Sequence, residues 1–175
     1  MPIYEINGKS PTISTEVAFI AESAIIIGDV EIGAGSVVFD NVVIEGNPMP
    51  IRIGKNVNIQ SGTIIHGLSD SPTIIEDFCT IGHQSLLHGC YLEELVTVGM
   101  GSIIMGYSRI ARGSIVGAKS LIPEKKTFSS LTLILGHPAK EIKILPETQL
   151  EQAKQIALKY SDHGRELKVK LKRIS

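Results

Sequence analysis

Three of the chain's five histidines are spaced so that they could bind a metal ion. His83 and His88 are five residues apart within TIGHQSLLHGC (residues 80–90), and His66 ends the earlier run NIQSGTIIH (residues 58–66). Imidazole nitrogens are common zinc ligands, and metal–nitrogen bonds are about 2.1 Å long, so shared ligands must lie within a few ångströms of each other. Whether these side chains converge depends on the elements that carry them.

Aliphatic residues recur at every sixth position along most of the chain. This period predicts a solenoid with three sides, in which each hexapeptide forms one side and successive coils pair as parallel strands about 4.8 Å apart. An ordinary β-rich domain also alternates inward and outward residues, but alternation alone does not fix a phase of six. The inward series comprises Ile20, Ile26, Ile32, Val38, Ile44, Ile53, Ile59, Ile65, Ile75, Ile81, Leu87, Leu92, Val98, Ile104, Ile110, Val116 and Ile122.

A second, smaller inward residue precedes many of these by two positions, on the same face of the strand. Cys79 and Cys90 both occupy this position, so we expect them to be core residues and neither metal ligands nor a disulfide. The other members are Ala24, Ser36, Thr63, Thr73, Ser85, Ser102, Ser114 and Ser120.

The six-residue register breaks in three places. Nine residues separate Ile44 from Ile53, which predicts a bulge near 47–50, and ten separate Ile65 from Ile75, which predicts a loop around 67–72. Leu87 and Leu92 are only five apart, a one-residue deletion. Excursions from a rigid scaffold are common places for function.

The pattern changes after Ile122, through a final turn and a crossing segment. We expect residues 1–145 to form the hexapeptide-repeat unit and residues 146–175 to form an α-helix and a basic tail that pack on it. The helix is predicted from Pro146 onward because Pro and Glu suit a helix start. Its expected apolar face contains Leu150, Ala153, Ile156, Ala157 and Tyr160.

The repeat separates the histidines. His66 and His88 each follow an inward aliphatic residue by one position, point outward, and lie one coil apart in the same column. His83 lies on the preceding side, and five residues of extended chain span up to roughly 16 Å, so His83 and His88 of one chain are not expected to share an ion. A neighbouring subunit's His83 would complete the site if the prisms packed around a three-fold axis. The spacing therefore predicts a homotrimer with metal sites at its interfaces; His137 and His163 are expected to be structural.

Composition limits the other partners. The formal charge is −1, so nucleic acid is offered no broad electrostatic attraction. The N-terminus lacks the pattern of a signal peptide, and no apolar run reaches the roughly 20 residues of a membrane span. We expect a soluble cytoplasmic protein that binds neither nucleic acid nor membrane.

Two segments, PIRIGKNVNIQSGTIIH and PTIIEDFCTIGHQSLLHGC, resemble the γ-class carbonic anhydrase family and its carbonic anhydrase-like branch; SLTLILGHPAKEI resembles the end of that family's prism. The likeness covers most of residues 10–145. It implies an all-β, left-handed parallel β-helix, a trimer, and Zn²⁺ (or Fe²⁺ or Co²⁺) held by His66 and His88 of one chain and His83 of the next. It also implies that Gln60 hydrogen-bonds near the metal-bound water as a catalytic residue. The implied reaction is reversible hydration of CO2 to bicarbonate by a metal-bound hydroxide.

Three residues depart from the family's pattern. Where the family has Arg-Gly-Asp, this chain has Glu45, Gly46 and Asn47, and Ser61 replaces an aspartate. By resemblance, the arginine helps to hold bicarbonate and pairs with an aspartate across the interface. Glu45 lies one coil before His66 in the same column. It would interact with that ligand, approach the metal or repel bicarbonate; alternatively, it pairs with Arg52 or with a neighbour's lysine.

These departures keep other functions open beside carbonic anhydrase. Many hexapeptide proteins transfer acyl groups from acyl-CoA with a catalytic histidine, and metal-assisted thioester hydrolysis is a related possibility. A non-catalytic role, as a metal carrier or structural partner, is the third.

Overall fold

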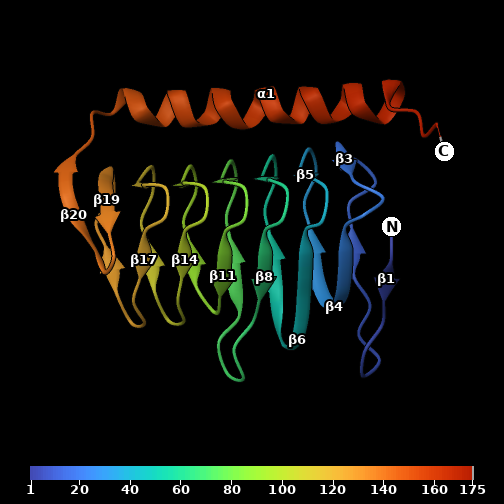
Figure 1. Ribbon diagram of the computed structural model, residues 1–175, viewed down its shortest axis with the longest axis horizontal. Coiled ribbons are helices and arrows are strands. Elements are labelled where there is room, and N and C mark those ends of the chain that lie inside the picture. The colour runs from blue at the N-terminus through green and yellow to red at the C-terminus, as the bar shows by residue number, and fades with distance from the viewer. Residues whose placement is uncertain (175) are drawn as a thin grey trace.

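The chain folds as a left-handed parallel β-helix with one long C-terminal helix, which confirms the predicted fold class. The structure is a computed structural model that describes residues 1–174. Ser175, the last residue of the predicted tail, lies outside the described residues. Coils stack side by side along one axis, and the helix runs the length of the stack (Figure 1). In the part of the chain described, no helix is long and apolar enough to cross a membrane.

Three faces form the prism, and we number them in the order in which the chain visits them. Face 1 contains β1 (Ile3–Tyr4), the first halves of β4 (Ile25–Ile32) and β6 (Val43–Ile53), β8 (Ile64–His66), β11 (Leu86–His88), β14 (Ile103–Ile104) and β17 (Leu121–Ile122). Face 2 contains β2 (Thr12–Ile13), the second halves of β4 and β6, β9 (Thr73–Ile75), β12 (Tyr91–Leu92), β15 (Arg109–Ile110) and β18 (Thr127–Phe128).

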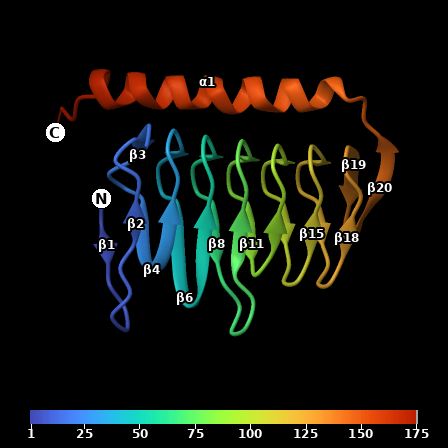
Figure 2. The same ribbon diagram turned by 180° about the vertical axis from the view of Figure 1, so that it is seen from behind.

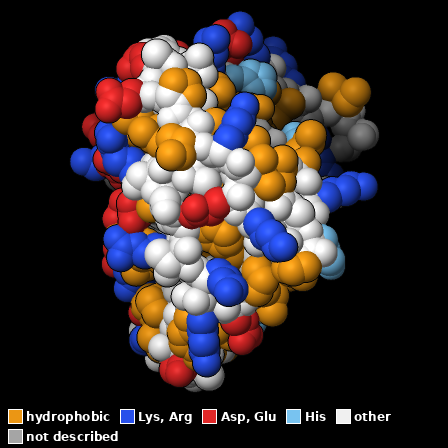
Figure 3. Space-filling model, turned by 90° about the vertical axis from the view of Figure 1, so that its left-hand side faces the viewer, with side chains coloured by type: hydrophobic (Ala, Val, Ile, Leu, Met, Phe, Trp, Pro, Cys, Tyr) orange, Lys and Arg blue, Asp and Glu red, His pale blue; other side chains and the backbone are white. Residues whose placement is uncertain are grey.

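Face 3 forms the second sheet and ends in the only antiparallel pairing of named strands within residues 1–174, between β19 and β20. Its strands are β3 (Phe19–Ile20), β5 (Val37–Val38), β7 (Asn58–Ile59), β10 (Thr80–Ile81), β13 (Thr97–Val98), β16 (Ile115–Val116), β19 (Thr132–Gly136) and β20 (Ala139–Ile144). Seen from the β20 end, basic, acidic and apolar side chains are interspersed over the surface (Figure 3).

The core consists of the two inward series that the period predicts. Every member of both is buried, except Ile20, which is half-buried against the core near the N-terminal end. Buried hydroxyls in the second series are satisfied by carbonyls: Ser36 Oγ donates to Gly54 at 2.8 Å and Ser102 Oγ to Gly117 at 3.0 Å. Small hydroxyl residues therefore fit the prism interior without an unpaired polar atom.

Two of the predicted irregularities appear as expected. Along β4 and β6 the register shifts so that Gly28 faces Gly46 while Val30 faces Ile51, and residues 47–50 form the bulge. Residues 67–72 connect β8 to β9 as a loop that protrudes beyond its neighbours (Figure 2). Both excursions lie at the edge between faces 1 and 2, immediately after Glu45 and His66.

Helix α1 (Thr148–Lys170) extends further than the sequence pattern indicated, and it buries Ala153 and Ala157 of the predicted apolar face. Its buried residues are small or polar, whereas Ile156, expected on the apolar face, is 40% exposed. The helix packs over face 3, where the outward residues Val37, Asn58 and Thr80 are consequently buried. The helix residues in this contact are Gln149, Ala153, Ala157, Ser161 and Gly164.

Candidate metal centre

His66 and His88 lie against each other at the ends of β8 and β11. The two residues are paired in register, and their rings stack with centroids 5.2 Å apart and an interplanar angle of 24°. His88 Nε2 lies 3.1 Å from His66 Nδ1. The six-residue repeat thus correctly predicted that His66 and His88 lie in the same column. They are one coil apart, so a single strand spacing separates their backbones.

The backbone around this pair is held by a buried threonine. Thr73 Oγ1 donates to the His66 carbonyl at 2.6 Å and accepts the Gly89 N–H at 2.8 Å. Gly89 N–H also lies 3.0 Å from the His66 carbonyl. Thr73 therefore joins the end of one histidine strand to the end of the other.

The donor chemistry of the pair fits a transition-metal ion. Tetrahedral zinc with bonds of about 2.1 Å places two ligand nitrogens roughly 3.4 Å apart, close to the 3.1 Å between these atoms. Burial, and then repulsion from His66, lowers the pKa of His88 below its usual value. A neutral imidazole is the form that binds metal, so the site favours the ligating state.

His83 does not join the pair within one chain. It follows β10 on the turn between faces 3 and 1, whereas His66 and His88 end their strands at the edge between faces 1 and 2. Within residues 1–174, no group of three histidine, cysteine or acidic side chains converges closely enough to hold a metal ion. A single chain thus offers two imidazoles on one edge of face 1 and an exposed third on the other edge.

Gln60 lies with His83 and apart from the histidine pair. Its side chain is buried, and Oε1 accepts the backbone N–H of His83 at 3.3 Å. Nε2 donates to Asn58 Oδ1 at 3.3 Å, and Asn58 in turn donates to Thr80. The amide therefore braces the turn that presents His83.

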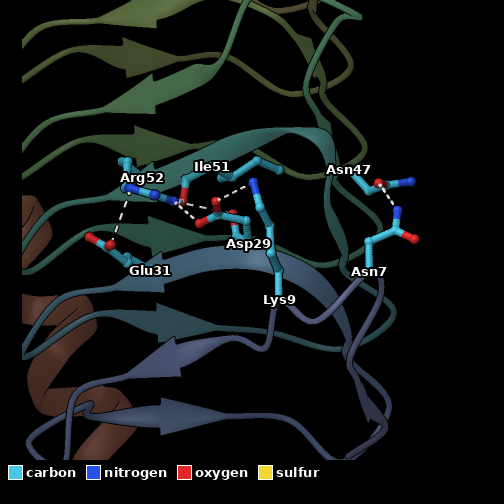
Figure 4. A network of polar contacts seen from close by, with 7 residues as sticks. All are labelled: Asn7, Lys9, Asp29, Glu31, Asn47, Ile51 and Arg52. Atoms are coloured by element: carbon cyan, nitrogen blue, oxygen red, sulfur yellow. Dashed lines mark hydrogen bonds and ion pairs between the residues drawn. The ribbon is translucent and has the colours of Figure 1, made fainter.

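Glu45 lies directly before His66 in the same column. β6 pairs Glu45 with His66, and both line a hollow of about 350 Å³ with His88. Arg52, one partner considered from the sequence, is not available to it: Arg52 lies 2.7 Å from Asp29 Oδ1 and 3.3 Å from Glu31 Oε1 (Figure 4).

The other two departures from the family pattern have ordinary surroundings. Asn47 Oδ1 accepts a hydrogen bond from Asn7, which ties the bulge after Glu45 to the N-terminal segment (Figure 4). Ser61 is half-buried, and its carbonyl accepts the Gln84 N–H. Neither side chain contributes a charge to the site.

The cysteines and the two remaining histidines stay outside the site. Cys79 and Cys90 are buried and free, as expected of core residues, and burial raises the pKa of Cys90 to about 12. The ring of His163 stacks on Phe39, with centroids 6.2 Å apart. His137 precedes Pro138 in the connection between β19 and β20.

The sequence did not single out two contacts that shape the site. Thr73 appeared only as a small inward residue, and Leu68 only as part of a loop. The available signal was the pair of glycines at 89 and 106, since a side chain at either position would collide with Leu68. A glycine beside a metal-ligand candidate indicates close packing of another segment.

Known proteins resemble this chain over nearly its whole length, although no protein-family model matches it. A carbonic anhydrase of Geobacillus kaustophilus is 40% identical over 93% of this chain and 88% of its own. Mitochondrial γ carbonic anhydrase 2 of Arabidopsis thaliana is 34% identical over 90% of this chain, which spans 59% of the plant protein.

A solved structure gives the same fold at similar identity. It is a candidate acetyltransferase of Bacillus cereus, 37% identical, with a TM-score of 0.91 over 95% of this chain and 96% of that one. Identity with the Geobacillus relative over most of both chains, together with the β-helix and the γ-class histidine segments, establishes the family. The chain belongs to the γ-class carbonic anhydrase-like family of hexapeptide-repeat proteins.

Proposed function

We propose that the protein is a homotrimeric metalloenzyme that catalyses the reversible hydration of CO2 to bicarbonate at sites shared between subunits. The observation that carries this proposal is the division of the histidines across face 1: a touching pair at one edge and an exposed third at the other. Two imidazoles leave a zinc site incomplete, and a second copy of the chain supplies the missing kind of ligand.

An apolar strip along face 1 supports the assembly. Six outward residues, one from each consecutive strand of this face, pair in register and remain half-buried or exposed; Ile64 is 46% exposed. A continuous apolar strip that remains partly accessible to solvent is typical of a protein–protein interface. The strip consists of Ile25, Val43, Ile64, Leu86, Ile103 and Leu121.

Each residue of the site has a separate proposed role. His66, His88 and a neighbour's His83 would hold the metal, zinc by preference, with iron or cobalt as alternatives. When bound, the metal supplies water activated as a nucleophile near neutral pH. Val43, Ile64 and Leu86 give the hollow an apolar wall, which suits the apolar CO2 molecule. Gln60 fixes the turn of His83, and its proposed catalytic role is to hydrogen-bond near the metal-bound water.

Complementation between two inactive variants tests the shared site. His83→Ala and His88→Ala should each assemble without retaining metal. Chains mixed after unfolding and refolded together should regain both metal and CO2 hydration, because an intact pair then meets an intact His83. The measurements are metal content of the isolated trimer and stopped-flow hydration with zinc- or iron-loaded protein.

His163→Ala provides a matched control, since that histidine lies on the helix side and should leave metal content unchanged. Metal retained by the His83→Ala protein alone, or a monomeric wild type, would contradict the shared site. Hydration by the loaded wild type no faster than by His66→Ala would contradict the enzyme activity.

Acyl transfer is the second candidate, supported by the likeness to the Bacillus cereus candidate acetyltransferase. In that case a histidine acts as a base and no metal is required. Turnover of short acyl-CoAs by metal-free protein would favour this function over carbonic anhydrase. Thioester hydrolysis that needs the metal, or firmly bound metal without either turnover, would indicate a thioesterase or a non-catalytic metal-binding protein.

A further inference from the structure

Glu45 places a negative charge on the wall of the histidine hollow. It is paired in register with His66 and lines the hollow with both histidines, while the remaining lining residues, Val43, Ile64, Ile65 and Leu86, are apolar. Within residues 1–174, its side chain makes no ion pair or hydrogen bond. The carboxylate on the wall of the hollow therefore has no partner within the described residues.

No cation offsets this charge in the described chain. Lysine and arginine are both absent from the hollow's lining, and Arg52 is held between Asp29 and Glu31 (Figure 4). The turn that would enter from a neighbour, residues 82–84, adds glycine, His83 and a glutamine. The completed site thus gains no lysine or arginine from that turn.

Glu45 does not join the two histidines as a third metal ligand within residues 1–174. Glu45 lies beside His66 but two coils from His88, so His66 separates the carboxylate from the far imidazole. A ligand entering beside the imidazole pair would nevertheless lie within one or two strand spacings of the carboxylate.

We propose that Glu45 makes this site select against anions, so that it takes neutral small molecules and holds anions such as bicarbonate weakly. This inference rests on the proposed metal site. Like charges a few ångströms apart at a partly buried position repel strongly enough to weaken anion binding by about tenfold, after allowance for salt screening. Neutral CO2 would enter freely, whereas bicarbonate would leave quickly and re-enter poorly.

Cobalt(II) provides a readout that does not depend on activity. The assembled full-length protein is loaded with cobalt, and its visible absorption is titrated with thiocyanate at constant ionic strength. Glu45→Gln should lower the thiocyanate Kd about tenfold. Imidazole, titrated as a neutral ligand at pH 8, should bind both proteins equally. Glu22→Gln removes the same charge from an exposed position outside the hollow and should change neither Kd.

The outcomes separate this inference from the proposed function. Cobalt bound to both proteins with equal thiocyanate affinity would overturn the role of Glu45 and leave the metal site standing. Equal tightening of thiocyanate and imidazole would also overturn it, because the effect would then come from shape. Absence of a cobalt spectrum in the wild type would overturn the metal site and this inference together.

Discussion

Thr73 has a measurable role in the histidine pair. Thr73→Val keeps the shape but removes the hydroxyl that bonds the His66 carbonyl at 2.6 Å and the Gly89 N–H at 2.8 Å. These two backbone groups still face each other at 3.0 Å, so part of the pairing survives. We expect the free energy of unfolding, measured in urea, to fall by about 1–2 kcal/mol, and bound metal to be lost faster to a chelator.

Thr127→Val is the matched control, because Thr127 occupies an exposed position on β18. It should change neither quantity. If Thr73→Val destabilised the fold but left the rate of metal loss unchanged, Thr73 would be a core residue without influence on the ligands.

At the residue scale, the sequence predicted the positions of side chains better than their ion-pair and hydrogen-bond partners. Period and phase fix which strand carries a residue and which way it points, so the pairing of His66 with His88 and of Glu45 with His66 could be predicted. The partners of Arg52 could not, because Asp29 and Glu31 belong to the previous coil, where β4 and β6 shift register around a bulge. Whether the three histidines bind metal stays a prediction.

The loop of residues 67–72 is anchored by the side chain of Leu68. This side chain occupies a socket, the space that Gly89 and Gly106 leave open by having no side chain. A Cβ on Gly106 would lie 2.1 Å from Leu68 Cδ1, and one on Gly89 would lie 2.7 Å away. Tyr107 donates a hydrogen bond to Asp70 at the loop's tip. Gly106→Ala should therefore displace Leu68, lower the free energy of unfolding by about 1–3 kcal/mol, and speed proteolysis within the loop.

A double variant separates the socket from other effects of the substitution. In Leu68→Ala/Gly106→Ala the collision is gone, so the alanine at 106 should add almost nothing to the cost of Leu68→Ala. Gly106 has an ordinary backbone conformation, so its substitution introduces a steric cost alone. Additive costs of the two substitutions would show that Leu68 does not occupy the socket.

Helix α1 shows why element packing was predicted only in part. Hydrophobic periodicity located the helix, but packing selected small residues where it approaches face 3 most closely. A Cβ on Gly164 would lie 2.7 Å from Val37 Cγ2, and Ser161 Oγ donates to the Gly35 carbonyl at 2.6 Å. Close approach over a flat sheet favours glycine, alanine and serine, which carry little hydrophobic signal, so Ile156 was wrongly assigned to the contact.

At the scale of the molecule, the six-residue repeat determines most of the fold. Once three hexapeptides make one coil, the inward series, the three faces and the columns of outward residues all follow, and the structure agrees with them. Handedness followed from the family resemblance, because general rules of chain crossover favour the opposite hand. Assembly can be inferred from a single sequence only indirectly, from outward residues that stay apolar along one face.

The apolar strip of face 1 makes the last prediction possible. Leu121 lies at its far end, three strands beyond the strand of His66, so a substitution there acts on assembly without touching the ligands. Leu121→Glu would bury a charge in the interface, and we expect sedimentation to show monomers that bind little metal although the circular dichroism spectrum is unchanged.

Ile142→Glu should remain trimeric and metal-loaded, since Ile142 is 56% exposed on β20 and outside face 1. The two variants add the same charge to the same chain, so they differ only in where it falls. If Leu121→Glu still formed a trimer with full metal, the interface would have to lie on another face. A Leu121→Glu monomer with full metal would instead show that one chain suffices to hold the ion, and His83 would lose its role. Because assembly and metal content are measured separately, the same pair of proteins distinguishes these two failures.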